Sequence, residues 1–493
     1  MAMNRLLTIF FYCLTPILLL SQPIRPHPEN PHYYLYQGKA AILITSAEHY
    51  GAVINKSFDY IAYLDALKEH GLNYTRIYPG AMFETADKWI TGNPSGPKPR
   101  DLILPWARSE QPGYMTGGNK FNLDQWNPEY FARLKDFIAK AGERGIVVEI
   151  CFFNSQYSDT WMVSPLYYEN NIQGIGKCAW QDAQALGCGA LPEHEGDYVR
   201  KITREVNSFD NVILEICDEC ASIGTGVDRA GPWVSRMMSA AYDTERELPQ
   251  KHLIAQEVEG PFGGPMDFSL DPRLSIITGQ YLWGGGEPNA RDGQMGGMRG
   301  LDYKYDLNKP IELNETDWYP IWYSGDKIAD ARVEAWEFIV GGGAGFNNLN
   351  GLYTPENPAG KSPENEQILG ALQNLMQFME GFNFLKMQPD PQFVVSGFEA
   401  SDLHHRAISE AGKQYALYIH HSTLHGGSYE VKPGKYQENL VVSLPPGNYK
   451  VDWVDPARGV IVATETLRDE GGYRVLSTPT YTVDIALRIK VQG

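Results

Sequence analysis

The sequence has few cysteines and comparatively few basic residues. Of its 493 residues 6 are Cys, and 42 Lys and Arg stand against 60 Asp and Glu, for a formal net charge of −18. Such a surface repels nucleic acid and anionic membranes, so neither is expected as a partner. The chain also lacks a Gly-rich phosphate loop, an HExxH motif, and a GxSxG motif between a strand and a helix. The sequence therefore predicts no nucleotide site, no zinc-protease site and no nucleophile elbow.

Long hydrophobic runs are also missing, with one exception at the N-terminus. Arg5 precedes an apolar run from Leu6 to Leu20 that Pro16 interrupts, and Ser21 follows as a small residue. A run of about 15 residues is short for a membrane span but typical of an export signal. We expect residues 1–22 to be a cleaved signal and the protein to be secreted or periplasmic, without membrane contact after cleavage. A retained anchor is the alternative.

Export permits disulfides, and Cys178 with Cys188 could close one loop. Cys217 and Cys220 have a spacing that also resembles a metal or redox pair, so a structural zinc is an open alternative.

The remaining chain predicts two domains. Apolar strand-like runs alternate with helix-like segments from residue 23 to 387, which is typical of a parallel α/β fold. The predicted strands are Ala41–Ile44, Tyr74–Ile77, Ile146–Phe152, Val212–Cys217, Leu253–Gln256, Ser275–Gln280, Ile311–Asn314 and Ala344–Leu349. Eight strands favour a (β/α)8 TIM barrel over an open sheet, although the helix between the fifth and sixth is poorly marked. Residues 388–493 contain short alternating runs separated by Pro and Gly turns, which predict an all-β sandwich.

Two strands of this barrel end at carboxylates. Asp218 and Glu219 follow the fourth strand, and Glu315 follows the seventh. Residues beyond the C-terminal ends of barrel strands converge on one pocket, and cleavage of a sugar acetal needs two carboxyl groups facing one bond. Glu219 and Glu315 are therefore the predicted catalytic pair. Glu215 and Glu312, inside the same strands, are alternatives.

The other strand ends carry acids, amides, one arginine and aromatic rings. Such a mixture suits a neutral polyhydroxylated substrate, because acids and amides bond hydroxyl groups and rings cover sugar faces. No cofactor or metal is required. The predicted substrate-binding residues are Arg76, Glu48, His49, Asn154, Asp218, Tyr281, Trp283, Trp318 and Asn347.

Several segments resemble glycoside hydrolase clan A, the cellulase-like barrel families. They are Gly71–Arg76, Phe121–Phe131, Asn211–Glu219, Lys309–Glu315 and Gly447–Pro456. Individually these segments are weak, but in this order they are fairly specific. More narrowly, the chain is similar to the apiosidase-like hydrolases, whose barrel is followed by a collagen-binding β-sandwich domain.

The resemblance implies a role for each matching residue. Glu219 would be the acid/base and Glu315 the nucleophile, with Arg76 holding the nucleophile ionised and Tyr281 as a further polar neighbour. Two positions depart from the clan. Asp218 replaces the Asn that donates to the sugar 2-hydroxyl, and Gln280-Tyr281 replaces the usual His-Tyr. An ionised Asp can only accept, so recognition at the 2-position is expected to differ.

The sequence thus predicts a retaining glycoside hydrolase that degrades a poly- or oligosaccharide by double displacement. The first alternative is a non-catalytic carbohydrate-binding protein on the same scaffold. The second is a metal hydrolase built on Cys217 and Cys220. The β-sandwich is expected to buttress the barrel, with carbohydrate contact as its alternative role.

Overall fold

The computed structural model describes residues 22–86, 92–283, 296–319, 327–425 and 427–492. The predicted signal at 1–22 lies outside these residues except for Gln22. Within the described ranges, no helix is both long and apolar enough to cross a membrane.

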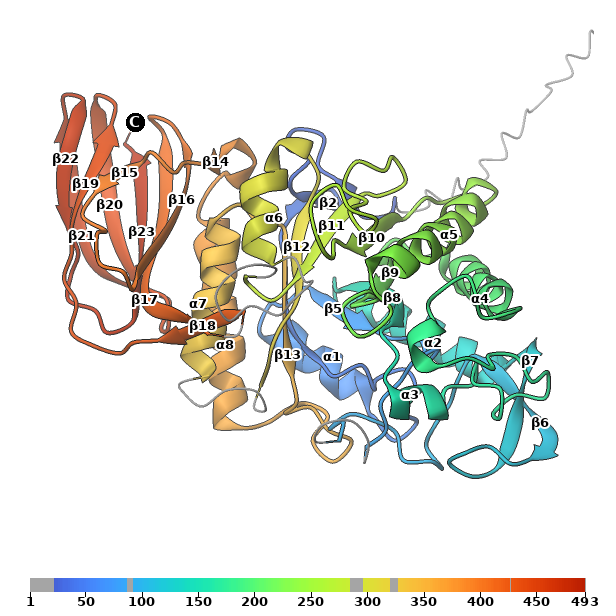
Figure 1. Ribbon diagram of the computed structural model, residues 1–493. Coiled ribbons are helices and arrows are strands. Elements are labelled where there is room, and N and C mark those ends of the chain that lie inside the picture. The colour runs from blue at the N-terminus through green and yellow to red at the C-terminus, as the bar shows by residue number, and fades with distance from the viewer. Residues whose placement is uncertain (1–21, 87–91, 284–295, 320–326, 426, 493) are drawn as a thin grey trace, which may run out of the picture.

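Eight parallel strands form one sheet in the order β4-β13-β12-β11-β10-β9-β8-β5, ringed by helices, and this confirms the predicted (β/α)8 barrel (Figure 1). The strands are β4 (Leu43–Glu48), β5 (Tyr74–Ile77), β8 (Val147–Asn154), β9 (Val212–Asp218), β10 (Leu253–Glu257), β11 (Ile276–Gln280), β12 (Ile311–Tyr319) and β13 (Gly345–Asn350). The end strands β4 and β5 meet at Asn73, whose side chain accepts from Ile44 N (3.0 Å) and donates to Ile42 O (2.8 Å). The side chain of Asn73 therefore links β4 to the start of β5 at the seam of the barrel.

The barrel helices begin where the sequence supplies caps. Asp59 caps the first helix, Asn127 caps the second, and Ser362 caps the last, with Pro at the first turn of the latter two. The α-helices are α1 (Tyr60–Glu69), α2 (Pro128–Glu143), α3 (Ser158–Val163), α4 (Leu191–Val206), α5 (Val227–Arg246), α6 (Gly297–Lys304), α7 (Lys327–Val340) and α8 (Pro363–Glu380). The 3-10 turns are η1 (Trp180–Asp182), η2 (Tyr305–Leu307) and η3 (Phe384–Lys386). The poorly marked helix between β10 and β11 is absent, because residues 258–275 form turns.

Two expectations for the barrel were wrong in detail. Strand β12 does not stop at Asn314 but continues to Tyr319, so Glu315 lies within a strand. The segment between β5 and α2, in which no strand was predicted, contains an antiparallel hairpin of β6 (Trp106–Pro112) and β7 (Asn119–Trp126).

A small N-terminal sheet covers the bottom of the barrel. It consists of β1 (Arg25–Pro26), β2 (Tyr34–Tyr36) and β3 (Lys39–Ala41). Tyr34 packs in one buried cluster with Leu43, Tyr74 and Val147, which stand at the starts of barrel strands. The N-terminal end of the barrel is thus plugged, and substrate access is left to the opposite end, here called the mouth.

The C-terminal region is a sandwich of two antiparallel sheets, as the sequence predicted. The larger sheet contains β14 (Gln388–Pro389), β16 (Leu403–Glu410), β17 (Gln414–His425), β18 (Ser428–Val431), β20 (Gly447–Asp455), β21 (Val460–Asp469) and β23 (Asp484–Val491). The smaller contains β15 (Val394–Ser396), β19 (Asn439–Leu444) and β22 (Gly472–Ser477). Side chains such as Leu417, Trp453 and Leu440 from both sheets fill the space between them.

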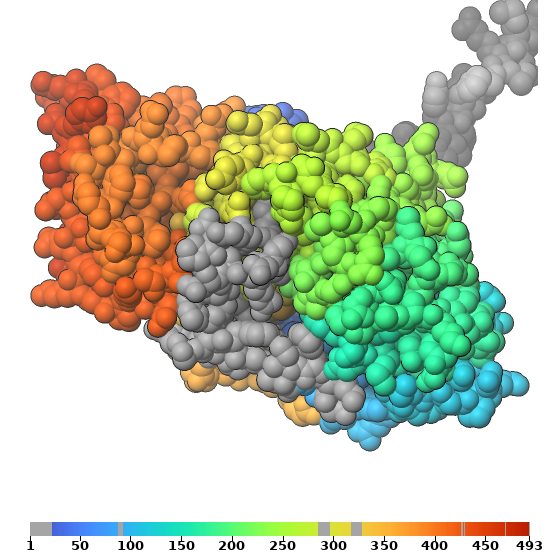
Figure 2. All heavy atoms as spheres, in the orientation of Figure 1, coloured from blue at the N-terminus to red at the C-terminus, as the bar shows by residue number. Residues whose placement is uncertain are grey.

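The outer face of the larger sheet packs on α7 of the barrel. Arg332 of α7 bonds Asp484 of β23 (2.9 Å), and Tyr418 of β17 donates to the same carboxylate (2.8 Å). Trp336 stacks on Tyr418, with ring centroids 5.5 Å apart. The two domains consequently form one continuous body with the sandwich at one end (Figure 2).

Candidate active site

The two predicted glutamates lie at the mouth, and a β-bulge directs one of them there. Strand β11 pairs with β12 through Gly279–Leu313 and then Gln280–Glu315, which leaves Asn314 as an extra residue. A bulge changes the direction of the side chains that follow it. Glu219 and Glu315 retain 4% and 8% exposure, whereas Glu215 and Glu312 are fully buried inside the barrel. Glu219 and Glu315 therefore remain the better candidates for the catalytic pair, and the fully buried Glu215 and Glu312 are the weaker ones.

Glu315 Oε2 accepts three hydrogen bonds. The donors are Tyr50 Oη (2.5 Å), Arg76 Nη1 (2.8 Å) and, at a longer distance, Tyr78 Oη (3.5 Å). Burial, with the negative charge of Asp218 adding to it, raises the pKa of Glu315 to about 8, although Arg76 acts to lower it. A carboxyl group with this pKa is protonated at neutral pH and ionises in mildly alkaline solution.

Arg76 is fully buried, and its charge is divided among three carboxylates. Its Nε and Nη2 bond Glu215 at 2.7 and 2.8 Å, and Nη2 also bonds Asp218 at 2.7 Å. Burial acts to lower the pKa of Arg76, but the neighbouring charges, Asp218 foremost, keep it well above its usual value. Arg76 contacts Glu315, but the prediction that it holds this carboxyl group ionised is wrong at neutral pH. Burial and the charge of Asp218 raise the pKa of Glu315 to about 8 in spite of Arg76.

Asp218 belongs to the framework under the site. Its carboxylate accepts from Arg76, from Tyr78 Oη (2.6 Å), from Asn154 Nδ2 (2.7 Å) and from Gln280 Nε2. The side chain is fully buried. Two carboxylate oxygens that already accept four hydrogen bonds have little capacity left for a sugar hydroxyl.

Glu219 is held in an unusual backbone conformation. Its φ is +49°, and its main chain is bonded on both sides, with N donating to Glu257 Oε2 (2.7 Å) and O accepting from Ser155 Oγ. Its side-chain Oε2 accepts from Tyr157 Oη (3.3 Å). The backbone and the carboxylate of Glu219 are therefore both oriented by neighbouring strands and loops.

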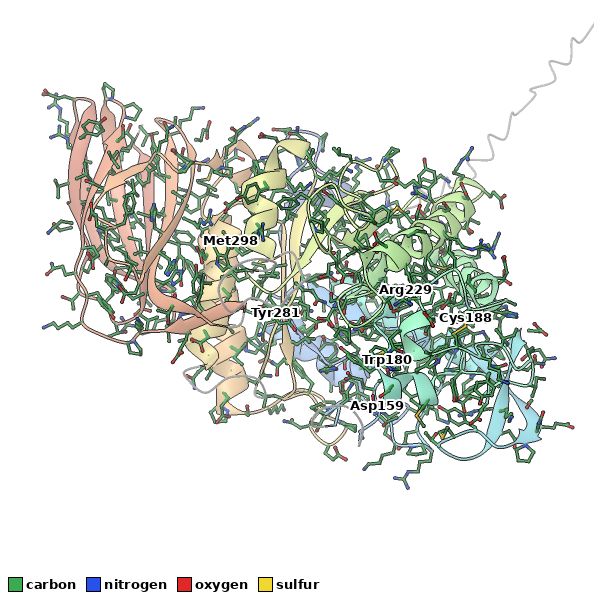
Figure 3. All side chains as sticks on the ribbon, viewed as in Figure 1. Asp159, Trp180, Cys188, Arg229, Tyr281 and Met298 are labelled. Carbon is green, nitrogen blue, oxygen red and sulfur yellow. A yellow bond between two sulfur atoms is a disulfide. The ribbon has the colours of Figure 1, made fainter. Side chains whose placement is uncertain are left out.

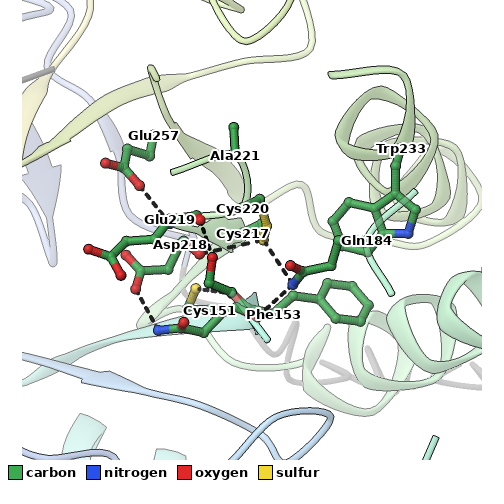
Figure 4. The surroundings of a disulfide bond; sticks show 12 residues. Cys151, Phe153, Gln184, Cys217, Asp218, Glu219, Cys220, Ala221, Trp233 and Glu257 are labelled. Carbon is green, nitrogen blue, oxygen red and sulfur yellow. Dashed lines mark hydrogen bonds between the residues drawn. A yellow bond between two sulfur atoms is a disulfide. The ribbon is translucent and has the colours of Figure 1, made fainter. Parts of the chain in front are cut away.

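Cys217 and Cys220 form a disulfide that brackets Asp218 and Glu219 (Figure 4). The second disulfide joins Cys178 and Cys188, as the sequence allowed, and Cys151 is free and buried. Sulfurs bonded to each other are not thiolate ligands, which argues against the zinc alternative. Among the described residues, no group of three or more His, Cys, Asp or Glu side chains is arranged to hold a metal ion.

Three non-glycine residues at the mouth have a strained backbone conformation. Tyr50, Glu219 and Tyr281 all have positive φ, and each comes one or two residues after a barrel strand. Non-glycine residues in this region of φ cost free energy and cluster at functional sites. The strained residues Tyr50 and Tyr281 therefore point to the same end of the barrel as the two carboxylates do.

The remaining predicted residues divide into three groups. His49 lies in the mouth and bonds Glu84 (2.7 Å), and Tyr281 N donates to Glu315 O (2.8 Å), next to half-buried Trp283. Glu48 and Asn347 instead serve the scaffold. The Glu48 carboxylate accepts from the backbone N–H of Gly51 and Ala52, and Asn347 bridges β4 and β12. The side chain of Trp318 lies outside the described residues.

Tyr50, Tyr78, Tyr157 and Glu84 also lie at the mouth, although they were not among the predicted site residues. Tyr78 shares the face of β5 with Arg76, a period-2 signal that the sequence does contain. Tyr157 and Glu84 sit in loops, where no periodicity points to them. The pKa of Tyr157 is raised well above its usual value by burial and by the charges of Glu219, Glu84 and Glu315. Tyr157 therefore lies close enough to these three acids for their charges to act on it.

No protein-family model matches the chain, and no curated protein matches it in sequence. Solved structures do resemble it. A glycoside hydrolase is similar at 11% identity and a TM-score of 0.61, over 96% of this chain and 97% of that chain. A glycoside hydrolase family 5 protein from Bacteroides vulgatus is similar at 11% identity and a TM-score of 0.61, over 95% and 93%. At such identity the likeness shows that the fold is shared along nearly the whole length of each chain.

Proposed function

We propose that the protein is an exported retaining glycoside hydrolase acting on a neutral poly- or oligosaccharide. The observation that carries the proposal is the pair of mouth carboxyl groups, Glu219 directly after β9 and Glu315 on β12, which have different hydrogen-bond partners. Glu315 is fixed by Arg76 and Tyr50, and Glu219 is oriented by Tyr157. Both structural neighbours with matching architecture are named as glycoside hydrolases, which supports the same reading. The two disulfides support export, since such bonds persist in oxidising compartments.

In this mechanism ionised Glu315 attacks the anomeric carbon while Glu219 protonates the departing oxygen. The glycosyl–Glu315 ester then reacts with water that Glu219 deprotonates, so the anomeric configuration is retained. Tyr50 and Arg76 both bond Glu315 Oε2, which orients the carboxylate for attack through its other oxygen, Oε1. The apiosidase-like subtype and the collagen-binding type of the second domain stay predictions from the sequence.

One observation favours the non-catalytic alternative. A nucleophile with a pKa of about 8 is mostly protonated at neutral pH, so a protein that works only at pH 7 or below would use Glu315 as a hydrogen-bonding group. Assays at pH 8–9 distinguish these two functions.

The first test is hydrolysis of a panel of neutral glycans and aryl glycosides by the wild type, Glu219→Gln and Glu315→Gln. We expect each substitution to lower kcat/KM by roughly 10²- to 10⁴-fold. Aryl glycosides with acidic phenols need no proton donor, so they should restore bond cleavage in Glu219→Gln but not in Glu315→Gln. Nuclear magnetic resonance of the first-formed product should show the anomer of the substrate.

The matched control is Glu143→Gln, an exposed glutamate at the end of α2. It should leave kcat/KM unchanged. Glycan binding by all of these proteins without sugar release at any pH would establish the carbohydrate-binding alternative.

A further inference from the structure

Strand β17 extends beyond the sandwich toward the barrel. Its residues Gln414–His420 pair with β23, but Ser422–His425 pair only with β18, in a register from Ser422–Val431 to His425–Ser428. We call this antiparallel pair the β17–β18 hairpin. It projects from the sandwich alongside α7 (Figure 1).

The hairpin contacts the segment that follows β11 at the mouth. Gly427 O accepts from Trp283 N (3.0 Å), and Tyr429 Oη accepts from Trp283 Nε1 (3.2 Å). A β-carbon at Gly427 would lie 3.1 Å from Trp283 O and 3.4 Å from Tyr281 Cβ. Tyr281, one of the strained mouth residues, lies beside the end of the hairpin (Figure 3). The hairpin therefore packs closely on one wall of the site.

A second connection runs through α7 to the strand that carries Glu315. Tyr429 N donates to Glu334 Oε1 (3.2 Å), and Glu334 Oε2 accepts from Thr316 Oγ1 (2.5 Å). Thr316 directly follows Glu315, and Glu334 is fully buried. One buried carboxylate thus joins the hairpin to the residue next to the proposed nucleophile.

The hairpin is also anchored within its own domain. Tyr429 Oη lies 3.2 Å from His404 Nδ1, and the rings of His404 and His420 each lie 4.7 Å from the Tyr429 ring, measured between centroids. Tyr429 is 2% exposed. The Tyr429 side chain therefore contacts His404 and His420 of the sandwich on one side and Trp283 of the barrel on the other.

We propose that Gly427 and Tyr429 are positioning residues of the active site, which make the second domain part of the catalytic centre. They hold the Tyr281–Trp283 wall directly and the Glu315 strand end through Glu334. This role rests on the proposed hydrolase function. If this role is correct, a small displacement of the hairpin slows the reaction, although neither Gly427 nor Tyr429 contacts the reacting atoms.

The test uses Tyr429→Phe and Gly427→Ala in the full-length chain. Tyr429→Phe keeps the packing and removes the hydroxyl bonds, and Gly427→Ala inserts a methyl group against Trp283 O. The matched control is Gly412→Ala in the same domain. Gly412 also has positive φ (+74°, against +98° at Gly427), but a β-carbon there would meet only the Pro445 ring at 3.8 Å or more. Both alanine variants therefore have a strained backbone, but only the methyl group of Gly427→Ala makes a close contact with the barrel.

We expect kcat to fall roughly 10- to 100-fold in Gly427→Ala and several-fold in Tyr429→Phe, with the acid limb of the kcat/KM–pH profile displaced in both. Gly412→Ala should lower Tm comparably to Gly427→Ala and keep wild-type kcat and pH profile. An active wild type whose two hairpin variants retain its kcat and pH profile overturns the positioning role alone. If Gly427→Ala does not fold, Tyr429→Phe decides. A wild type that releases no sugar from any glycan overturns the proposed function, and the positioning role with it.

Discussion

Arg76 lies among three carboxylates, and the way its charge is shared sets the properties of the site. Glu215 and Asp218 take three of its four carboxylate contacts, and Glu315 takes one. Burial and the charge of Asp218 consequently leave Glu315 with a pKa of about 8. If Glu315 is the nucleophile, activity needs ionised Glu315 together with protonated Glu219. The acid limb of the kcat/KM–pH profile should then be set by Glu315 and lie near pH 8.

Replacing Asp218 by Asn, which removes the charge and keeps the size of the side chain, tests this account. Removal of one negative charge next to Glu315 favours the ionised carboxylate, so the acid limb of the kcat/KM–pH profile should move down by about one pH unit or more. The measurement is the profile between pH 5 and 10, with Asp197→Asn on exposed α4 as the charge-matched control. An unmoved limb in Asp218→Asn would contradict the role of Asp218.

At the scale of single elements, the end of β9 is held by more restraints than an ordinary strand–loop junction. The disulfide between Cys217 and Cys220 closes a short loop around Glu219, whose backbone has positive φ and bonds to Glu257 and Ser155. Restraints of this kind keep a strained conformation populated. The loop therefore orients the proposed acid before substrate binds.

We expect the double variant Cys217→Ser/Cys220→Ser to lose kcat by roughly tenfold or more with a modest decrease in Tm. The comparison variant is Cys178→Ser/Cys188→Ser, which opens the disulfide with the larger sequence separation, 10 positions against 3. In the chain-entropy model a disulfide that closes a longer loop stabilises the fold more, by about 2–3 kcal/mol for Cys178–Cys188. This variant should therefore show a larger decrease in Tm and a smaller decrease in kcat than Cys217→Ser/Cys220→Ser. Equal losses of kcat in both double variants would show that the loop around Glu219 has no special role.

Over the whole molecule, buried carboxyl groups make stability depend on pH. Burial raises the pKa of Glu312 and Glu259 to about 7 and that of Glu195 to about 8. Such groups bind their protons more tightly when folded, so their contribution is complete below about pH 4.5 and is lost as pH rises to 7–8. Glu337 acts in the opposite direction. Although burial raises its pKa, His420 and Arg406 lower it to about 2, so its contribution is lost as pH falls from 4.5 toward 2.

Stability should therefore be greatest near pH 4.5–5, well below the pH of greatest activity. As the pH rises from 4.5 to above the raised pKa, each of these carboxyl groups should lower the free energy of unfolding by about 3–5 kcal/mol. Chemical denaturation at pH 5 and pH 8.5 measures the difference. Glu195→Gln keeps the shape and cannot ionise, so it should reduce the decrease between the two pH values, whereas Glu193→Gln on the exposed face of α4 should not. A wild type that is equally stable at both pH values would contradict this account.

The sequence alone determined the fold class, the two-sheet C-terminal region and the convergence of Arg76, Glu219 and Glu315, because strand periodicity and parallel topology place strand ends together. Tertiary structure decided what those residues can do. The bulge at Asn314, the positive φ of Glu219 and the four donors around Asp218 arise from contacts between residues far apart in the chain, which no local pattern records. Tertiary structure also brought Gly427 and Tyr429 to the mouth, about 200 residues after Glu219, since only the docked sandwich places them beside Tyr281 and Trp283. Burial, which no linear pattern measures, then raised the pKa of Glu315, one of the two carboxyl groups that the sequence had identified.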